Sequence, residues 1–385
     1  MKRILFAHQS TIPHYRVPFY NALQQRIPND WCFDVVFDSS EVNEKRFFQE
    51  PLDVTRFTFP TVDTRTYLVK LGSKKIKYQT FWLKAAKYDL IIVGGAMDNL
   101  TYPLCQLHQL HQTKFAYWGH AKNRRIANPN YLRVLFEKFR MILHHKADGI
   151  FAYTQGVKLY LESQGIAAQN IFVFNNTIDI DLQHRVYKQL LPNREKFRQE
   201  QGLNGKKVIL FVGRYTKNKR ISFLLDSFSI LASRDDSFHL LLVGSGVENY
   251  PINNHHNIST FGPIVDIENL GSIYVASDIF SFPGAVGLGP LQALCFNLPV
   301  VTIDSPTHMP EFEYLSPANS IILPENATPE LYAQTILNIF QNNPNDDNQK
   351  IGDFKSTIWP SIRHLTIDQM ANNFIEGINT LLYST

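Results

Sequence analysis

Short, mostly apolar runs alternate with longer segments of helical periodicity along the whole chain, and this alternation limits the fold more than any other feature. The runs are nearly continuous in Val, Ile, Leu and Phe, as strands buried on both faces of a parallel sheet require. They lie at 4–7, 33–37, 90–93, 115–118, 150–153 and 171–174, then at 208–212, 240–243, 258–261, 279–282 and 300–303. Helical patterns fall between them, at 100–111, 131–145, 156–164, 222–232 and 268–276. The order predicts parallel sheets covered by helices.

One polar, charge-rich segment near 180–205 interrupts the series, which restarts at Lys207. A length of 385 residues also exceeds one ordinary core and suits two domains. We therefore predict an α/β protein with two Rossmann-like doubly wound domains facing a central cleft. The expected domains are 1–185 and 186–365, with a closing helix at 366–385 that returns to the first. Ligands of such sheets bind at the carboxyl ends of the strands, so the cleft is the expected site.

Composition excludes several classes of protein. Hydrophobic residues make up 44% of the chain and charged residues 19%, a balance that excludes wholesale disorder. No uncharged apolar stretch is long enough to span a membrane, and the short run after Met1 favours a strand over a signal peptide. Cys32, Cys105 and Cys295 are far apart and form no CxxC pair, which favours neither a disulfide framework nor a zinc site. The expected location is the cytoplasm.

Charge is distributed unequally between the two halves. Residues 1–180 carry 23 Lys and Arg against 14 Asp and Glu, whereas residues 181–385 carry 15 against 20. The basic half suits an anionic partner, such as the inner face of a membrane, a lipid phosphate or an acidic glycan, or is a solvated basic face. No nucleic-acid-binding motif accompanies the charge, so we expect no nucleic acid partner.

The segment 131–143 has apolar residues at helical spacing and basic residues over much of the rest. We favour a helix whose apolar side faces the core. The alternative is a helix lying on a membrane surface, which the neighbouring cluster Lys70, Lys74, Lys75 and Lys77 would support.

The second half holds the strongest chemical motifs. Gly213 and Arg214 end a predicted strand, and Lys219 follows where we expect the next helix to start. Two cations at the end of a strand, near a helix N-terminus, can bind a pyrophosphate and stabilise the negative charge that develops on it when it is the leaving group. Gly244 and Gly246 form a small-residue turn after the next strand. A glycine-rich loop, 284–289, then leads into a predicted helix near Pro290, an arrangement typical of anion binding.

These motifs resemble the retaining GT-B glycosyltransferases grouped as family 4, and the first half resembles the bacterial polysaccharide-type branch of that family. The resemblance covers residues 1–315 in the right order. Its cues in the second half are Gly213-Arg214 with Lys219, Gly244 with Gly246, Pro283-Gly284 with Val286-Gly287-Leu288, and Leu298-Pro299-Val300-Val301. Its cues in the first half are Tyr15-Arg16-Val17-Pro18-Phe19, Val93-Gly94-Gly95, Trp118-Gly119-His120 and Asn176-Thr177-Ile178-Asp179.

The resemblance implies a role for each position. His120, Arg214 and Lys219 would form the catalytic set, with the two cations on the donor's pyrophosphate. The expected donor-binding residues are Gly213, Gly244, Gly246, Pro263, Ile264, Gly284, Ala285, Val286, Gly287, Leu288, Gln292, Glu311 and Glu313. The expected acceptor-binding residues are His14, Tyr15, Arg16, Gly94, Gly95 and Arg124. The alternative for Arg16, which follows the first predicted strand, is a charge on a surface loop.

One departure from the family pattern concerns the donor sugar. The family usually has two glutamates eight positions apart, where this chain has Gly284 and Gln292. An amide at Gln292 can still hydrogen-bond a ribose, but Gly284 offers the sugar no side chain, so Glu311 and Glu313 are the substitute candidates.

The function we predict is metal-independent transfer of a sugar, with retention, from a UDP- or GDP-sugar to a glycan, lipid-linked or small-molecule acceptor. No cofactor is expected beyond the nucleotide sugar. The alternatives are a nucleotide-sugar epimerase and a non-catalytic protein that binds sugar nucleotides or glycans.

Overall fold

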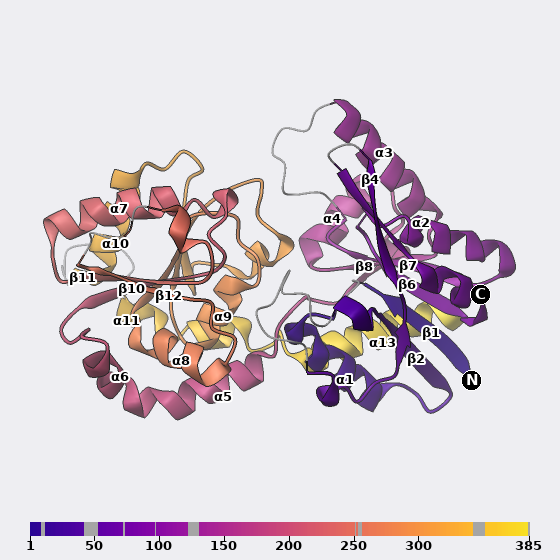
Figure 1. Cartoon of the computed structure of the whole chain (residues 1–385), viewed down its shortest axis with the longest axis horizontal. Coiled ribbons are helices and arrows are strands. Elements are labelled where there is room, and N and C mark those ends of the chain that lie inside the picture. Colours follow the sequence, from indigo (N-terminus) through magenta and orange to yellow (C-terminus); the bar gives the residue numbers. More distant parts are fainter. Residues whose placement is uncertain are drawn as a thin grey trace. The chain divides into compact units, whose positions relative to one another are not determined.

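The computed structural model describes residues 1–8, 12–41, 53–71, 74–96, 98–121, 131–250, 252, 256–341 and 351–383. The chain divides into two compact units, which are described one at a time (Figure 1). Unit 1 comprises Met1–Thr177 and Leu365–Thr385, and unit 2 comprises Ile178–His364.

Unit 1 is built on a seven-stranded parallel sheet in the order β3-β2-β1-β6-β7-β8-β9. Its strands are β1 (Lys2–Ala7), β2 (Trp31–Phe37), β3 (Thr61–Asp63), β6 (Leu90–Gly94), β7 (Lys114–Gly119), β8 (Gly149–Ala152) and β9 (Ile171–Val173). Its α-helices are α1 (Val17–Arg26), α2 (Thr101–Cys105), α3 (Tyr131–Lys146), α4 (Gln155–Ser163) and α13 (Ile367–Tyr383). An antiparallel hairpin, β4 (Thr66–Leu71) with β5 (Lys74–Gln79), stands apart from this sheet.

Helix α13 closes the core of unit 1 although it lies at the other end of the chain. The ring of Phe374 stacks on Phe151 at a centroid distance of 4.3 Å and lies 4.8 Å from both Trp118 and Phe174. One turn later the helix approaches the sheet so closely that a Cβ at Gly377 would lie 2.6 Å from the Phe151 ring. Glycine is needed there because any side chain would push the helix away from the sheet.

Unit 2 has a six-stranded parallel sheet in the order β12-β11-β10-β13-β14-β15. Its strands are β10 (Lys207–Val212), β11 (Phe238–Val243), β12 (Ile258–Phe261), β13 (Ile279–Phe282), β14 (Val300–Ile303) and β15 (Ser320–Leu323). Its helices are α5 (Ile180–Leu190), α6 (Arg194–Glu200), α7 (Ile221–Arg234), α8 (Ile267–Ala276), α9 (Gly289–Cys295), α10 (Pro329–Phe340), α11 (Ile351–Phe354) and α12 (Ile358–Ile362). From β10 the chain adds β11 and β12 on one side of the sheet, and from β13 it adds β14 and β15 on the other. The switch point between β10 and β13 is where such α/β sheets bind ligands.

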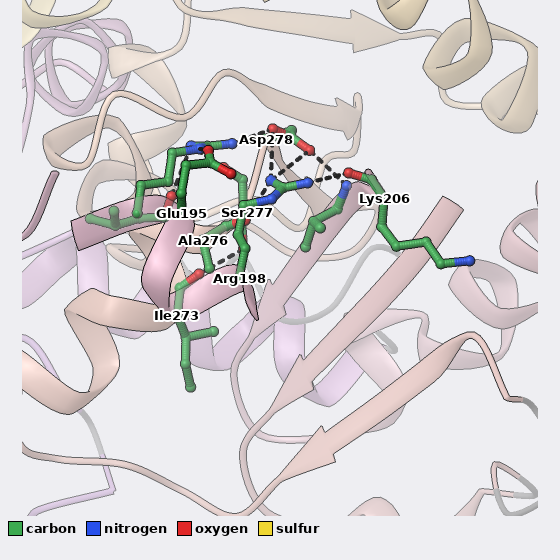
Figure 2. A network of polar contacts seen from close by, with 10 residues as sticks. Glu195, Arg198, Lys206, Ile273, Ala276, Ser277 and Asp278 are labelled. Carbon is green, nitrogen blue, oxygen red and sulfur yellow. Dashed lines mark hydrogen bonds and ion pairs between the residues drawn. The ribbon is translucent and has the colours of Figure 1, made fainter. Parts of the chain in front are cut away.

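A network of polar contacts around Asp278 ties helix α6 to the sheet of unit 2 (Figure 2). The carboxylate pairs with Arg194 at 2.5 Å and with Arg198 at 3.3 Å, and it accepts the backbone N–H of Val208 at 2.7 Å. Arg198 also donates to the carbonyls of Ala276 and Lys206. All of these groups are at the amino ends of β10 and β13, away from the ligand edge, so the network stabilises the scaffold.

The predicted architecture of two Rossmann-like domains is confirmed, and every apolar run named above coincides with a strand, although Tyr153 and Phe174 each lie one residue past the strand's end. The position of the domain boundary differs from the prediction. The predicted boundary at 185 falls inside helix α5, which begins at Ile180 with its N-terminus capped by Asp179. That helix belongs to unit 2, where His184 bonds the carbonyl of Cys295 at 3.1 Å, so the second unit begins at Ile178.

The preferred interpretation of 131–143 as a core-facing helix is wrong. Helix α3 forms, but it leaves Leu135, Phe136, Phe139 and Ile142 exposed and buries Arg140 and His144 instead.

Candidate functional site

The carboxyl ends of β10 and β11 in unit 2 are held together by two glycines. A Cβ at Gly244 would lie 1.9 Å from the carbonyl oxygen of Gly213, and both glycines have positive φ, +142° and +159°. Only glycine allows this approach. The two turns are joined further by the Tyr215 amide, which donates to Ser245 at 2.9 Å. Arg214 lies between Gly213 and Tyr215 at this edge of the sheet, so its backbone position is fixed while its side chain is exposed.

Lys219 is the second predicted cation, and its surroundings differ from the prediction. Helix α7 begins two residues later than expected, at Ile221, because a short 3-10 helix (Lys217–Lys219) and a left-handed Arg220 precede it. The Lys219 ammonium donates to the carbonyl of Ala285 and lies 4.7 Å from the centre of the Phe282 ring. Lys219 therefore connects the β10–α7 loop to the glycine-rich loop.

The glycine-rich loop packs backbone against backbone on the β10–α7 loop. A Cβ at Gly284 would lie 2.4 Å from both Cα and the carbonyl carbon of Lys219 and 2.5 Å from the oxygen of Asn218. The Ala285 amide donates to that same oxygen at 2.9 Å. The missing side chain at Gly284 thus has a structural reason, because the backbone of the neighbouring loop occupies its space.

His308 holds the other side of this loop and was missed by the sequence analysis. Its Nδ1 accepts the amide of Val286 at 3.0 Å, and its Nε2 donates to the carbonyl of Ile303 at 2.8 Å. These bonds require the neutral Nε2–H tautomer. The Met309 amide donates back to the carbonyl of Val286 at 2.9 Å. The position of His308, shortly after strand β14, is the signal that could have found it.

The amides predicted to bind the donor divide into two groups. Those of Ala285 and Val286 already donate to Asn218 and His308, so these two expected donor-binding residues have no N–H group left for a ligand. Within the described part of unit 2, the amides of Gly287 and Leu288 have no hydrogen-bond acceptor. These two N–H groups are therefore the ones open to an anionic or sugar oxygen.

The remaining predicted donor residues lie on neighbouring elements of unit 2. Gln292, on helix α9, is half-buried between Gln183 at 3.3 Å and the hydroxyl of Tyr274 at 3.5 Å. Glu311 is buried and Glu313 exposed, both in the 3-10 helix Pro310–Tyr314 that follows Met309. The other three are Gly246, in the turn after β11, and Pro263 and Ile264, after β12.

The corresponding edge of unit 1 carries an aromatic and imidazole cluster. His8, which follows strand β1, stacks on Trp118 at 4.2 Å, and its Nε2 meets the Tyr153 hydroxyl at 3.1 Å. His120, which follows β7, lies 5.9 Å from the same Tyr153 ring. Neither His8 nor Tyr153 was singled out from sequence, although each directly follows a strand, as His120 does.

Burial lowers the pKa of His8 well below its usual value, and the charges of Arg16 and His120 lower it further. His8 is therefore neutral near pH 7, and its Nδ1, which has no hydrogen-bond partner in the described part of the chain, is available for a hydrogen bond.

Arg16 is buried in unit 1, and the view of it as a surface loop charge is wrong. It lies in the 3-10 helix His14–Arg16, donates to Asn176 at 2.6 Å and to the sulfur of Met370 at 3.7 Å, and is covered by the ring of Trp118. No carboxylate pairs with it among the described residues of unit 1. A small hollow beside it is lined largely by apolar side chains.

The other predicted acceptor residues are close to this cluster in the fold. His14 and Tyr15 are half-buried, and the Tyr15 ring lies 5.1 Å from the Arg16 guanidinium. Gly94 ends β6, where a Cβ would lie 2.6 Å from the His8 carbonyl, and the Gly95 amide donates to Trp118 at 3.0 Å. Arg124 lies outside the described residues.

Two features are absent from the described residues. No group of three or more His, Cys, Asp or Glu side chains there is arranged to hold a metal ion. None of the described helices combines the length and the apolar character needed to cross a bilayer.

Comparison with known proteins gives a family match for unit 2. Residues 206–342, which include Arg214, Lys219 and the glycine-rich loop, match the family described as "Glycosyl transferases group 1". Mannosylfructose-phosphate synthase of Agrobacterium fabrum is 26% identical over 182 residues. That match spans 42% of this chain and only 39% of the relative.

Solved structures extend the likeness to the full length. Anabaena Alr3699/HepE in complex with UDP has a TM-score of 0.69 at 13% identity, over 99% of this chain and 100% of its own. A glycosyltransferase from Rickettsia africae also scores 0.69, at 17% identity, over 100% and 99%. A putative UDP-N-acetylglucosamine 2-epimerase from Listeria monocytogenes scores 0.60 at 15% identity, over 100% and 98%. At these identities the likeness to solved structures shows the GT-B fold alone, and the family match concerns unit 2.

Proposed function

We propose that the protein transfers a sugar from a nucleoside diphosphate sugar to an acceptor. The observation that carries the proposal is the family match over 206–342, because this segment contains the exposed Arg214, the anchored Lys219 and the two open amides. A fixed cation and preorganised N–H groups stabilise the negative charge that develops on a departing diphosphate. Each of these groups lies at the carboxyl edge of the sheet, beside the switch point.

The donor we favour is a UDP-sugar, with a GDP-sugar as the alternative. HepE, whose fold this chain shares, has been solved with UDP and also with UDP-glucose. We further infer that transfer proceeds with retention, as a hexosyltransferase of family 4, that it serves polysaccharide biosynthesis in the cytoplasm, and that the acceptor is a glycan, a lipid-linked sugar or a small molecule. In this scheme the donor's phosphate takes the acceptor proton, His120 stabilises the transition state from unit 1, and Arg214 and Lys219 replace a metal ion.

Donor binding is the first test. Wild type is titrated with UDP, GDP and their common sugars while the melting temperature is followed. A nucleotide at about 100 times its dissociation constant stabilises the folded state by about 2.7 kcal/mol, which gives a measurable shift. Arg214→Ala should abolish the shift, whereas Lys217→Ala, which removes an exposed cation from the same loop, should keep it. A shift that survives in Arg214→Ala, or none with any nucleotide, contradicts the donor site.

Transfer itself is tested with the nucleotide that binds and a panel of acceptors. Activity should persist in a chelator, and complete loss of turnover there refutes metal independence. NMR of the product's anomeric proton decides between retention and inversion.

The epimerase alternative rests on the shared fold with the Listeria protein. Isomerisation of a UDP-sugar in the absence of any acceptor would favour it over transfer. Binding of a donor without hydrolysis, transfer or isomerisation would favour the non-catalytic alternative, which the departure at Gly284 and Gln292 motivates.

A further inference from the structure

Helix α3 of unit 1 turns apolar side chains to the outside and polar side chains to the core. Its buried side carries Arg140, 4% exposed, and His144, 2% exposed, while Phe139 and Ile142 are 50% and 53% exposed. Amphipathic helices in globular proteins normally turn their apolar stripe to the core. This orientation is supported by the His144 ring, which lies edge-on to Tyr117 of strand β7 at 4.7 Å, while Arg140 pairs with Glu137 one turn earlier on the same helix.

The apolar side chains of α3 belong to a larger exposed set. Of the 21 large hydrophobic side chains that are exposed among the described residues, 13 lie between 67 and 142 and only four in unit 2. Single exposed apolar residues are ordinary, but their concentration in this stretch of the sequence sets it apart from the rest of the described chain. The 13 are Tyr67, Leu68, Val69, Leu83, Leu100, Leu107, Leu110, Tyr131, Val134, Leu135, Phe136, Phe139 and Ile142.

Hydrogen bonds connect the segments that carry these residues. The amide of Leu100 donates to Lys77 in strand β5 at 2.9 Å. The side chain of Gln106, beside Leu107 in the 3-10 helix Gln106–His111, donates to the carbonyl of Leu143 in α3 at 2.9 Å. The hairpin β4–β5, the leucine-bearing segment and α3 are thus joined in unit 1. We call the 13 side chains the apolar surface.

Basic residues accompany the apolar surface. Residues 65–146 contain 15 Lys and Arg against three Asp and Glu, which is more than the whole excess of positive charge in residues 1–180. Of the described ones, six are exposed: Arg65, Lys70, Lys84, Lys87, Lys138 and Lys146. The last two lie on α3 among its exposed apolar side chains. Apolar side chains mixed with lysine are typical of segments that lie in the headgroup region of an anionic bilayer.

We propose that the apolar surface docks unit 1 on an anionic lipid bilayer. Lysine ammonium groups meet lipid phosphates while Phe139, Ile142 and their neighbours enter the boundary with the acyl chains. The charge argues against a second copy of the chain as the occupant, because two such surfaces would bring many like charges together. The inference does not depend on sugar transfer, since it concerns a different surface and needs no nucleotide.

The test is flotation of the purified protein with vesicles of phosphatidylcholine alone or mixed with phosphatidylglycerol. Wild type should bind the mixed vesicles and lose binding when salt shortens the Debye length to about 3 Å. Phe139→Glu/Ile142→Glu should lower the partition coefficient by on the order of a hundredfold, because two apolar anchors are lost and two negative charges are added. The matched control is Leu331→Glu, which alters a side chain that is 46% exposed on α10 of unit 2 and should bind as wild type does.

Folding and self-association are checked on the same samples. Both exposed substitutions should leave the melting temperature and the circular dichroism spectrum unchanged. Failure of wild type to bind anionic vesicles overturns the proposal, as does binding that the double variant leaves intact. A dimer of wild type in sedimentation that the double variant dissociates also overturns it, because the surface then joins two copies.

Discussion

A substitution of Gly284 by alanine tests the close contact on which the donor-site geometry rests. The added Cβ would lie 2.4 Å from Cα and from the carbonyl carbon of Lys219, and 2.5 Å from the oxygen of Asn218. All three are backbone atoms, so no side-chain rotation relieves the contact. One of the two loops must move by about 1 Å to reach ordinary van der Waals separation.

The structure allows the cost to be estimated. Overpacking of this kind costs about 1–3 kcal/mol. The movement also breaks two hydrogen bonds that cross between the loops, from the Ala285 amide to Asn218 and from Lys219 to the Ala285 carbonyl, each worth about 0.5–1.5 kcal/mol. The sum is roughly 2–6 kcal/mol, and at about 2–4 °C per kcal/mol it lowers the melting temperature of unit 2 by roughly 5–20 °C.

Differential scanning calorimetry, with and without UDP, measures both consequences. The control is Gly287→Ala in the same loop, where the nearest atom to a new Cβ is Met309 Cγ at 3.9 Å, so its melting temperature should stay close to wild type. Gly284→Ala should also weaken UDP binding, because Lys219 loses its anchor. Equal melting temperatures for the two variants would refute the reasoning, since the loops would then not be in contact.

Further predictions concern stability. Asp278→Asn should destabilise unit 2 by about 3–5 kcal/mol in urea unfolding, because Arg194 and Arg198 lose their partner carboxylate; an effect below about 1 kcal/mol contradicts this. Phe374→Ala should destabilise unit 1 by about 3–5 kcal/mol, and isolated residues 1–177 should fail to fold cooperatively. Burial lowers the pKa of His144 to about 3, so the unfolded chain binds a proton there below about pH 6.5 and the folded unit does not. The free energy of unfolding of unit 1 should thus fall by about 2 kcal/mol between pH 6.5 and about pH 5 on account of this histidine. His144→Leu should remove this dependence of the unfolding free energy on pH.

The sheets of both units could be predicted from the sequence because their strands are buried on both faces. Such strands appear as continuous apolar runs, and two series of runs separated by a polar segment indicate two domains. Strands β3, β4, β5 and β15 were missed because they are not long, fully buried apolar runs. β15, Ser320–Leu323, has only three apolar residues in a row, of which Ile322 is exposed, and the hairpin β4–β5 has exposed apolar side chains and several lysines.

The outward orientation of the apolar side chains on α3 and the burial of Arg16 could not be predicted, because both contradict the average behaviour of their residue types. Hydrophobic periodicity locates a helix and its stripe but does not say whether the stripe meets protein or something else. Arg16 is stabilised by Asn176 and Met370, far away in sequence. No local pattern contains those contacts.

The position of Gly284 links the departure from the family pattern to the mechanics of the donor site. Three loops are interlocked there: Asn218 and Lys219 hold Ala285, while His308 and Met309 hold Val286. A glutamate at 284 is incompatible with this packing, so the loop presents backbone where the family pattern has a carboxylate. The proposed donor sugar must then be contacted by the open amides of Gly287 and Leu288 or by carboxylates on the same interlocked assembly, of which Glu313 is exposed. Glu313→Gln should therefore raise the KM for the nucleotide sugar while leaving UDP binding unchanged, and an equal effect on both ligands would place the sugar elsewhere.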